Sequence, residues 1–307
     1  MDTLSVAMWA TNLEVSAVSL EAWVGFVEAK MMEFSSSTPQ ILALPEFACM
    51  QWLSFSPPGL TVPDQLPWLA AQAVEALVML RPLAARYNVA LLPGTMPHAL
   101  IDEKGSTRYA NRAWLFLPDG REVSQDKLCL TPSEMDPQGW LLSPGTDVEI
   151  IEWAGLRIAI LICLDVEFTS LWARLGKLDL DLILIPAKTG LISGYYRVFS
   201  CAYARATELQ TVVCVVGAVG TPGSNPATDV VMGGACAYVP CDGALGYTGI
   251  AAALGPHAAA SGLSPILIAH DLPVGYCRKM RHGAAEAEVW PSSWSADHVI
   301  INDPAAS

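Results

Sequence analysis

The sequence predicts an α/β layered fold, because short apolar runs alternate with amphipathic stretches along the whole chain. Hydrophobic residues make up 52% of the 307 residues and charged residues only 15%, so the chain can bury a sizeable core. Two runs, Leu156–Leu161 and Leu182–Ile185, are continuously apolar, which is typical of strands covered on both faces. No internal repeat or linker divides the chain, so we expect a single domain over residues 1–280 and a tail over residues 281–307.

The other elements are predicted from the same patterns. A helix capped by Ser16 or Ser19 is expected to run to about Phe34. The Pro-Asp-Gly turn within Tyr109–Asp126 predicts a β-hairpin, and Ser56–Pro67 is expected to be a loop. Further helices are predicted at Trp68–Arg86, Phe168–Leu175 and Tyr195–Leu209. Further strands are predicted at Leu4–Ala10, Gln40–Leu44, Val89–Leu92, Thr211–Val216, Ala235–Val239 and Pro265–His270.

Charge and composition exclude several classes of protein. The net charge of −13 argues against nucleic-acid binding, which needs a basic face, and against anionic membrane surfaces. No apolar run reaches the ~18 residues needed to span a bilayer, and the first run is short and follows Asp2, so a cytoplasmic protein is expected. The eight cysteines are scattered, and Cys236 and Cys241 lack a second pair or a nearby histidine. We therefore expect reduced thiols and no metal site.

Three side chains at predicted strand ends can carry chemistry. Glu46 follows the run QILALP, Lys127 follows the second arm of the hairpin, and Cys163 ends the run LRIAILI. Loops that leave the carboxyl ends of strands form the ligand crevice in α/β folds. Alone, each residue has an ordinary structural explanation as a solvated carboxylate, a surface lysine or a core thiol. Together they provide a base, a cation and a thiol, the set that acyl transfer by a sulfur nucleophile requires.

Three segments carry a family resemblance: LALPEF at Leu42–Phe47, DKLCLTPSE at Asp126–Glu134 and ILICLDVEF at Ile160–Phe168. In this order they resemble the three signatures of the nitrilase superfamily, the carbon–nitrogen hydrolases. The segments RYANRAWLFLPDG and ARATELQTVVCVVGAVG also resemble the family, so the likeness extends over most of the predicted domain. Residues 1–280 are therefore expected to form a carbon–nitrogen hydrolase domain.

The resemblance implies a four-layer αββα sandwich in which Glu46, Lys127 and Cys163 converge in one pocket. Cys163 is then the nucleophile that forms a thioester, and Glu46 is the general base. Lys127 and the backbone N–H of Leu164 are expected to stabilise the oxyanion. Glu134 matches the second glutamate of many members and is a candidate for orienting Lys127 or the substrate amide. The implied enzyme uses no cofactor.

The sequence departs from the family pattern at several positions. Cys129 replaces a common histidine, Leu164 replaces a usual aromatic residue, and Ala235–Cys236 replaces the usual serine region. These three departures leave the catalytic set intact. Lys188 follows Pro-Ala where a neutral residue is common, and so it can change the pocket.

The residues after the nucleophile indicate the class of substrate. Asp165 occupies the third position of Cys-Leu-Asp, where the amidase and carbamoylase branches usually have aspartate and nitrilases have glutamate. The resemblance therefore favours a small amide or N-carbamoyl substrate, with release of ammonia or an amine. Lys188 and Tyr195 are possible substrate-binding residues. A substrate carboxylate would suit Lys188 or Arg197.

Three alternatives stay open. The same triad can hydrolyse a nitrile, or the chain can be a non-catalytic binding protein with a vestigial pocket. The retained polar residues argue against a vestigial pocket, since burying them costs stability unless they are used or paired. A redox protein with a peroxidatic Cys163 lacks an obvious resolving partner in the sequence. The loops Met50–Pro67 and Leu191–Tyr196 are expected to form the pocket walls, but they do not identify the substrate.

The resemblance also implies a homodimer or a larger homo-oligomer, in which two sandwiches meet face to face. The tail over residues 281–307 is too apolar for a free end, because it contains Trp290, Trp294, Ile300 and Ile301. We therefore expect the tail to pack on a partner subunit.

Overall fold

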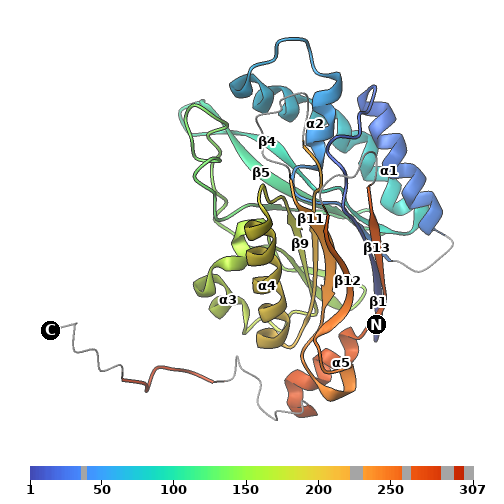
Figure 1. Cartoon of the computed structure of the whole chain (residues 1–307), viewed down its shortest axis with the longest axis vertical. Helices are drawn as coiled ribbons and strands as arrows, with labels where there is room; N and C mark the ends of the chain where they lie inside the picture. Colours follow the sequence, from blue (N-terminus) through green and yellow to red (C-terminus); the bar gives the residue numbers. More distant parts are fainter. Residues whose placement is uncertain (36–39, 222–230, 258–263, 285–293, 301–307) are drawn as a thin grey trace.

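Two β-sheets lie face to face at the centre of the molecule, and helices cover the outer face of each sheet (Figure 1). The computed structural model describes residues 1–35, 40–221, 231–257, 264–284 and 294–300. The layers follow in the order helices, first sheet, second sheet, helices. The predicted four-layer αββα sandwich is therefore confirmed.

The first sheet has seven strands in the order β13-β1-β2-β3-β5-β4, and β6 pairs with β5 outside this path. Strands β1, β2 and β3 are parallel, whereas β4, β5 and β6 form an antiparallel meander. The bounds are β1 Leu4–Trp9, β2 Ile41–Ala43, β3 Ala90–Leu92, β4 Thr95–Ile101, β5 Thr107–Phe116, β6 Glu122–Asp126 and β13 Ile266–Leu272. The ends of β2 and β6 lead directly to Glu46 and Lys127.

The second sheet has six strands in the order β12-β11-β10-β9-β8-β7. Strands β8, β9 and β10 are parallel, and the outer pairs are antiparallel. The bounds are β7 Ile151–Trp153, β8 Leu156–Ile160, β9 Leu182–Ala187, β10 Val212–Gly217, β11 Gly233–Tyr238 and β12 Ile250–His257. The ends of β8 and β9 lead to Cys163 and Lys188, so this sheet provides the thiol side of the site.

Helices form the two outer layers. The first sheet is covered by α1 and α2, and the second by α3 and α4. The bounds are α1 Leu20–Phe34, α2 Val62–Tyr87, α3 Thr169–Leu175, α4 Ile192–Leu209 and α5 Val274–Lys279. Short helical turns are η1 Ala48–Phe55, η2 Cys163–Glu167, η3 Gly243–Leu245 and η4 Met280–Ala284. The helix α1 begins after Ser19, whose side chain accepts a hydrogen bond from the N–H of Ala22, so the Ser19 alternative is confirmed.

The alternation of strand side chains builds two cores. In β1, Val6 and Met8 belong to the core between the sheets, whereas Ala7 belongs to the core beneath α1 and α2. Strands β9 and β10 are buried along their whole length, because one face meets the first sheet and the other meets the helices. This arrangement is the physical reason for the continuous apolar run Leu182–Ile185.

The helix α2 begins earlier than the sequence predicted. It starts at Val62 and not at Trp68, so the expectation of a loop up to Pro67 was wrong. Pro63 lies in the first turn, where its missing N–H has no intrahelical partner in any case. By length and composition alone this helix could cross a membrane, but its buried residues pack on α1 and the first sheet as in a core helix.

Three strands were not predicted from the sequence: β4, β12 and the three-residue strand β7 at Ile151–Trp153. Strand β4 contains Pro97 and His98, and strand β12 is rich in alanine and glycine, so neither has a strong strand signal. Both lie at the edges of their sheets, where a proline is tolerated because one side of the strand has no partner. The predicted hairpin is therefore the second half of a three-stranded meander.

The chain after β13 stays attached to the domain through Arg281. Its buried side chain donates to Asp181 at 2.8 Å and to the carbonyl of Gln210 at 2.9 Å, and it also pairs with Asp179. Arg281 therefore packs against the second sheet and its loops, and the boundary after residue 280 stays a prediction.

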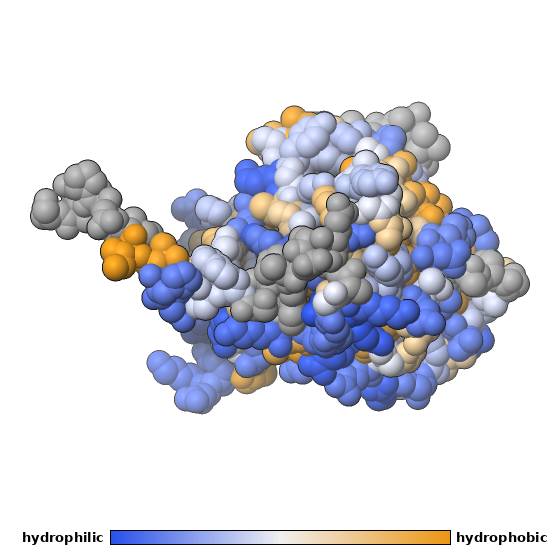
Figure 2. All heavy atoms as spheres, turned by 90° about the horizontal axis from the view of Figure 1, so that it is seen from below, coloured by the Kyte–Doolittle hydropathy of each residue, from blue (hydrophilic) through white to orange (hydrophobic). Residues whose placement is uncertain are grey.

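The described part of the tail, residues 294–300, is exposed. Trp294 is 60% exposed and Ile300 is 82% exposed. Figure 2 shows hydrophobic surface at the end of this segment, beside the largely hydrophilic surface of the domain. Trp290 and Ile301 lie outside the described residues. Packing of the tail on a partner subunit stays a prediction, as does the oligomeric state.

Candidate functional site

Glu46 lies three residues beyond β2 and is 2% exposed. Two backbone features fix its position. Phe47 adopts a left-handed conformation with φ of 53°, which turns the chain into η1. Gly94, with φ of 83°, lies so close to Pro45 that a Cβ atom there would be 2.2 Å from the Pro45 carbonyl oxygen. Only glycine fits beside the loop that carries the carboxylate.

Lys127 follows β6 and is also 2% exposed. Its backbone N–H donates to the carbonyl of Asn111 at 2.9 Å, which extends the β5–β6 ladder by one bond. Its ammonium donates to Glu46 Oε1 and to both carboxylate oxygens of Glu134, each at 2.8 Å. Burial acts to lower the pKa of Lys127, but the charges of Glu46, Cys163 and Glu134 outweigh burial and raise it. The lysine is therefore a fixed cation.

Glu134 is held by its own loop. Its Oε2 atom accepts hydrogen bonds from the N–H of Thr131 at 2.8 Å and from the hydroxyl of Thr131 at 2.9 Å. The amide of Asn111, which is fully buried in β5, donates to Glu46 Oε1 at 2.9 Å. The two glutamates thus contact the same lysine, and each carboxylate has a further donor. Glu134 is positioned to orient Lys127, as predicted from the resemblance.

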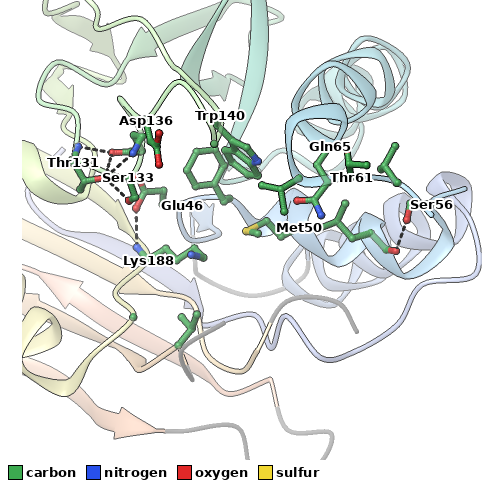
Figure 3. A pocket seen from close by; sticks show the side chains of 18 of the residues that line it. Glu46, Met50, Ser56, Thr61, Gln65, Thr131, Ser133, Asp136, Trp140 and Lys188 are labelled. Atoms are coloured by element: carbon green, nitrogen blue, oxygen red, sulfur yellow. Dashed lines mark hydrogen bonds between the residues drawn. The ribbon is translucent and has the colours of Figure 1, made fainter. Parts of the chain in front are cut away.

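Cys163 lies at a sharp turn between β8 and η2. Its φ of 49° is rare for a residue with a side chain and indicates a strained backbone at this point. The thiol lies 3.7 Å from the carbonyl oxygen of Lys188, to which it donates. The N–H of Lys188 in turn donates to Glu46 Oε2 at 2.9 Å, as Figure 3 shows. One residue at the end of β9 therefore contacts both the predicted nucleophile and the predicted base.

The electrostatics of the site keep the thiol protonated at rest. Burial raises the pKa of Cys163 well above its usual value, and the charge of Glu46 raises it further. The ammonium of Lys127 acts in the opposite direction but does not outweigh these effects. Lys127 thus favours the thiolate, but its charge does not make the thiolate the resting form. Thiolate formation must accompany proton transfer to a nearby base.

Asp165 connects the lysine loop to the nucleophile turn. Its carboxylate is fully buried and accepts hydrogen bonds from the N–H groups of Ile162 at 2.9 Å and Cys129 at 2.7 Å, with a third from Leu128 at 3.2 Å. Burial raises the pKa of Asp165 to about 6, although the N–H donors act in the opposite direction. The role of Asp165 is therefore structural, because its carboxylate links two loops that are distant in the sequence.

Asp165→Asn is expected to lower the free energy of unfolding by about 1–3 kcal/mol. Both carboxylate oxygens accept backbone N–H groups, so the NH₂ of asparagine must face a donor. Urea unfolding of the variant measures the loss. The control is Asp297→Asn, at an exposed aspartate of the described tail, which should change stability by less than ~0.5 kcal/mol. Equal stability of the two variants would show that the link contributes nothing.

A single cavity of about 1210 Å³ contains the site. Glu46, Lys127 and Cys163 line one end of the cavity. Trp140 and Met50 lie beyond them in Figure 3, and the ring of Trp140 also packs edge-on against Phe47, which follows the base, with 5.0 Å between centroids. The far end is formed by η1 and the start of α2 and includes Ser56, Thr61 and Gln65. The cavity can hold a ligand much longer than the bond that reacts.

The structure brings together most, but not all, of the predicted site residues. Lys188 lines the cavity, and Leu164 follows Cys163 in η2. Tyr195 does not line it, and the prediction that it binds substrate was wrong. Tyr195 is 4% exposed and stacks on Phe199 with centroids 4.0 Å apart, because its position in α4 faces the second sheet. Of the predicted walls, Met50–Pro67 lines the cavity, whereas Leu191–Tyr196 does not.

Sequence reasoning missed three residues of the site. Asn111 is a buried polar residue inside an apolar hairpin strand, and this contrast was the available signal. Thr131 and Trp140 lie in the loop after Lys127 and had no readable pattern. Within the described ranges, no group of three or more His, Cys, Asp or Glu side chains is arranged to hold a metal ion.

The comparisons with known proteins agree with this geometry. The carbon-nitrogen hydrolase family matches residues 10–281 of the chain. The probable hydrolase YhcX of Bacillus subtilis is 28% identical over 78% of the chain, and an (R)-stereoselective amidase of a Pseudomonas species is 31% identical over 37%. The matched segments span 45% and 39% of the lengths of the two relatives.

Solved structures show the same fold. The structure of a cysteine-to-alanine mutant of an amidase from Nesterenkonia, in complex with butyramide, superposes on this chain with a TM-score of 0.65. The match is 19% identical and covers 92% of this chain and 95% of that chain. The match to the family covers most of the chain, including all of the residues that converge on Cys163. The chain therefore belongs to the carbon–nitrogen hydrolase family.

Proposed function

We propose that this protein hydrolyses the carbon–nitrogen bond of a small amide, or of an N-carbamoyl compound, through a thioester on Cys163. The observation that carries the proposal is the position of Glu46. Its carboxylate contacts the Lys127 ammonium at 2.8 Å and the Lys188 N–H at 2.9 Å, while the thiol of Cys163 donates to the carbonyl of the same Lys188. A base, a fixed cation and a thiol thus meet in one cavity.

The first half of the reaction forms the acyl-enzyme. Glu46 takes the thiol proton as Sγ of Cys163 attacks the amide carbon, which avoids a free buried thiolate that the raised thiol pKa disfavours. The protonated Glu46 then gives this proton to the substrate nitrogen. The carbon–nitrogen bond breaks, ammonia or an amine leaves, and a thioester remains on Cys163.

The second half hydrolyses the thioester. Glu46 takes a proton from water as the water oxygen attacks the thioester carbon. The proton returns to Sγ when the carbon–sulfur bond breaks, and the carboxylic acid product leaves. The free enzyme is regenerated without any net change in its protonation.

Two groups can stabilise the oxyanion that forms in both halves. Lys127 is the fixed cation beside the reacting carbon. The backbone N–H of Leu164 is the second group. The first hydrogen bond within η2 is donated by the N–H of Asp165 to the carbonyl of Ile162, so the N–H of Leu164 makes no hydrogen bond within the turn. Each such donor is typically worth ~10²–10³ in rate.

The relatives support an amide in preference to a nitrile. One curated relative is an (R)-stereoselective amidase, and the Nesterenkonia amidase has been solved with butyramide. A glutamate-to-glutamine mutant of that amidase shows covalent addition of the acetamide moiety of fluoroacetamide at the active-site cysteine. The same reagent is therefore a rational probe for Cys163.

The decisive experiment traps the acyl group. The protein is mixed with butyramide and hydroxylamine, and we expect both ammonia and butyrohydroxamic acid, because hydroxylamine competes with water for the thioester. Rapid-quench mass spectrometry should locate a butyryl group on Cys163. Cys163→Ala should abolish ammonia release, hydroxamate and adduct together.

The matched control is Cys214→Ala, which removes a buried thiol of β10 outside the cavity. This variant should retain hydroxamate formation. A panel of aliphatic, dicarboxylic and N-carbamoyl amides and of nitriles extends the assay to the other predicted substrates. Absence of ammonia and of any Cys163 adduct across the whole panel would refute the proposal. Turnover of nitriles alone would show that the substrates are nitriles and not amides.

A further inference from the structure

Lys188 has a backbone role in the site, but its side chain remains to be explained. The residue follows β9, where its N–H and carbonyl contact Glu46 and Cys163. Any residue type except proline could make these two backbone contacts. The side chain lines the cavity, and in Figure 3 it extends from the Glu46 end in the direction of Met50. A cation is therefore held within one side-chain length of the reacting groups.

The ammonium of Lys188 lacks a protein counter-charge among the described residues. The side chain is half-buried, yet no described carboxylate lies within 4.0 Å of its nitrogen. The nearest catalytic carboxylate, Glu46, accepts the backbone N–H of Lys188 and the ammonium of Lys127 instead. A lysine withdrawn from water is normally paired, and because no described carboxylate pairs with Lys188, an anionic ligand can supply the negative charge.

The other cation of the cavity is already engaged. Among the described lining residues, Lys127 and Lys188 are the two that carry positive charge. The ammonium of Lys127 contacts the carboxylates of Glu46 and Glu134, so its positive charge is already balanced by protein carboxylates. The other charged residue of the lining, Asp136, is negative. Among the described lining residues, Lys188 is therefore the cation whose charge no neighbouring carboxylate offsets.

We propose that Lys188 is a specificity-determining residue that binds a carboxylate of the substrate. The preferred substrates are then amides whose acyl chain carries a carboxylate a few bonds from the amide carbon, as in monoamides of short dicarboxylic acids. The short distance follows from the four-carbon lysine side chain, which begins at the residue that touches both Glu46 and Cys163. This inference rests on the proposed amide hydrolysis.

The test compares two substrates of nearly equal shape. Succinamate carries the carboxylate, and levulinamide replaces one carboxylate oxygen by a methyl group. The quantity measured is the ratio of kcat/KM for succinamate to kcat/KM for levulinamide. Lys188→Met should lower this ratio by about 10- to 100-fold, because one charge-assisted hydrogen bond is lost. Lys188→Arg retains the charge and should keep most of the preference.

The control is Arg197→Met. Arg197 is an exposed cation of α4 that pairs with Glu167 at 2.7 Å and does not line the cavity. Its loss should leave the ratio unchanged. Circular dichroism of each variant verifies folding, and the ratio cancels any general loss of activity that both substrates share.

The outcomes separate this inference from the proposed function. If wild-type protein hydrolyses levulinamide as well as succinamate, or if Lys188→Met leaves the ratio unchanged, carboxylate binding by Lys188 is refuted and amide hydrolysis stands. If Arg197→Met lowers the ratio instead, Arg197 and not Lys188 binds the substrate carboxylate, and the assignment to Lys188 is refuted. If no amide is hydrolysed and no Cys163 adduct forms, the proposed function itself fails.

Discussion

Lys127→Met is expected to lower kcat/KM for amides by at least ~10³-fold, because it removes a fixed cation from the oxyanion site and disturbs the base as well. It should also lower the free energy of unfolding by about 3–5 kcal/mol, the usual cost of removing one partner from a buried ion pair. Lys127 and Glu46 are each 2% exposed, so water cannot replace the lost charge. Both effects are among the largest that a single substitution in this chain can have.

The loss of stability should depend on pH in a predictable direction. Without Lys127, the carboxylates of Glu46 and Glu134 share one buried site and repel each other. The pKa of one of them must rise above its value in the unfolded chain. The folded variant then binds a proton that the unfolded chain has released, so its stability falls as pH increases through that window. Destabilisation should be larger near about pH 8 than near about pH 5.

Guanidinium or urea unfolding at the two pH values measures this effect. The control is Lys104→Met, at an exposed lysine of the β4–β5 turn, and it should change neither stability nor rate. If Lys127→Met does not fold, Lys127→Arg keeps the charge and should recover most of the stability. Wild-type stability of Lys127→Met at both pH values would show that the buried ion pairs are not part of the folded state.

Glu46→Gln is expected to lower kcat by about 10²- to 10⁴-fold, the range for loss of a general acid–base group. The carboxylate accepts three donors, from Asn111, Lys127 and Lys188. Glutamine offers one acceptor oxygen in place of two, so its NH₂ must also face at least one of these donors. Proton transfer from the thiol and the geometry of the base are lost together.

The pH profile distinguishes loss of a base from loss of shape. The acid limb of kcat/KM for butyramide should disappear in Glu46→Gln, because the carboxylate that acts as the base is no longer there to be protonated. The control is Glu75→Gln on the exposed face of α2, which should keep both rate and profile. An unchanged acid limb in Glu46→Gln would assign the base to another residue.

The sequence was sufficient to locate the chemistry that strand ends carry. Glu46, Lys127 and Cys163 each follow a strand, where α/β folds place ligand-binding loops, and the resemblance of their segments to the family signatures predicted that they converge in one pocket. Ser19 was likewise readable, because a cap satisfies its helix locally. Such features depend on a few neighbours along the chain, which is the range over which sequence patterns carry information.

Features that depend on distant approach were not predictable. Asp165 receives N–H groups from a loop 36 residues earlier, and no local pattern encodes that meeting. The contacts of Lys188 with Glu46 and Cys163 are made by its backbone, so its residue type cannot indicate them. Tyr195 is the opposite case. Its spacing with Val198 and Phe199 is that of the buried face of a helix, so this pattern predicts that Tyr195 faces the core and not the cavity.

The division of the site between the two sheets has a consequence for how the protein responds to stress. Glu46 and Lys127 are carried by the first sheet, and Cys163 by the second. Lys188, at the end of a strand in the second sheet, is the residue that touches both sides. On the proposed mechanism, catalysis therefore requires the two sheets to keep their positions relative to each other. Heat, pressure or a substitution far from the cavity could displace one sheet relative to the other. Such a displacement would abolish activity while every strand remained intact.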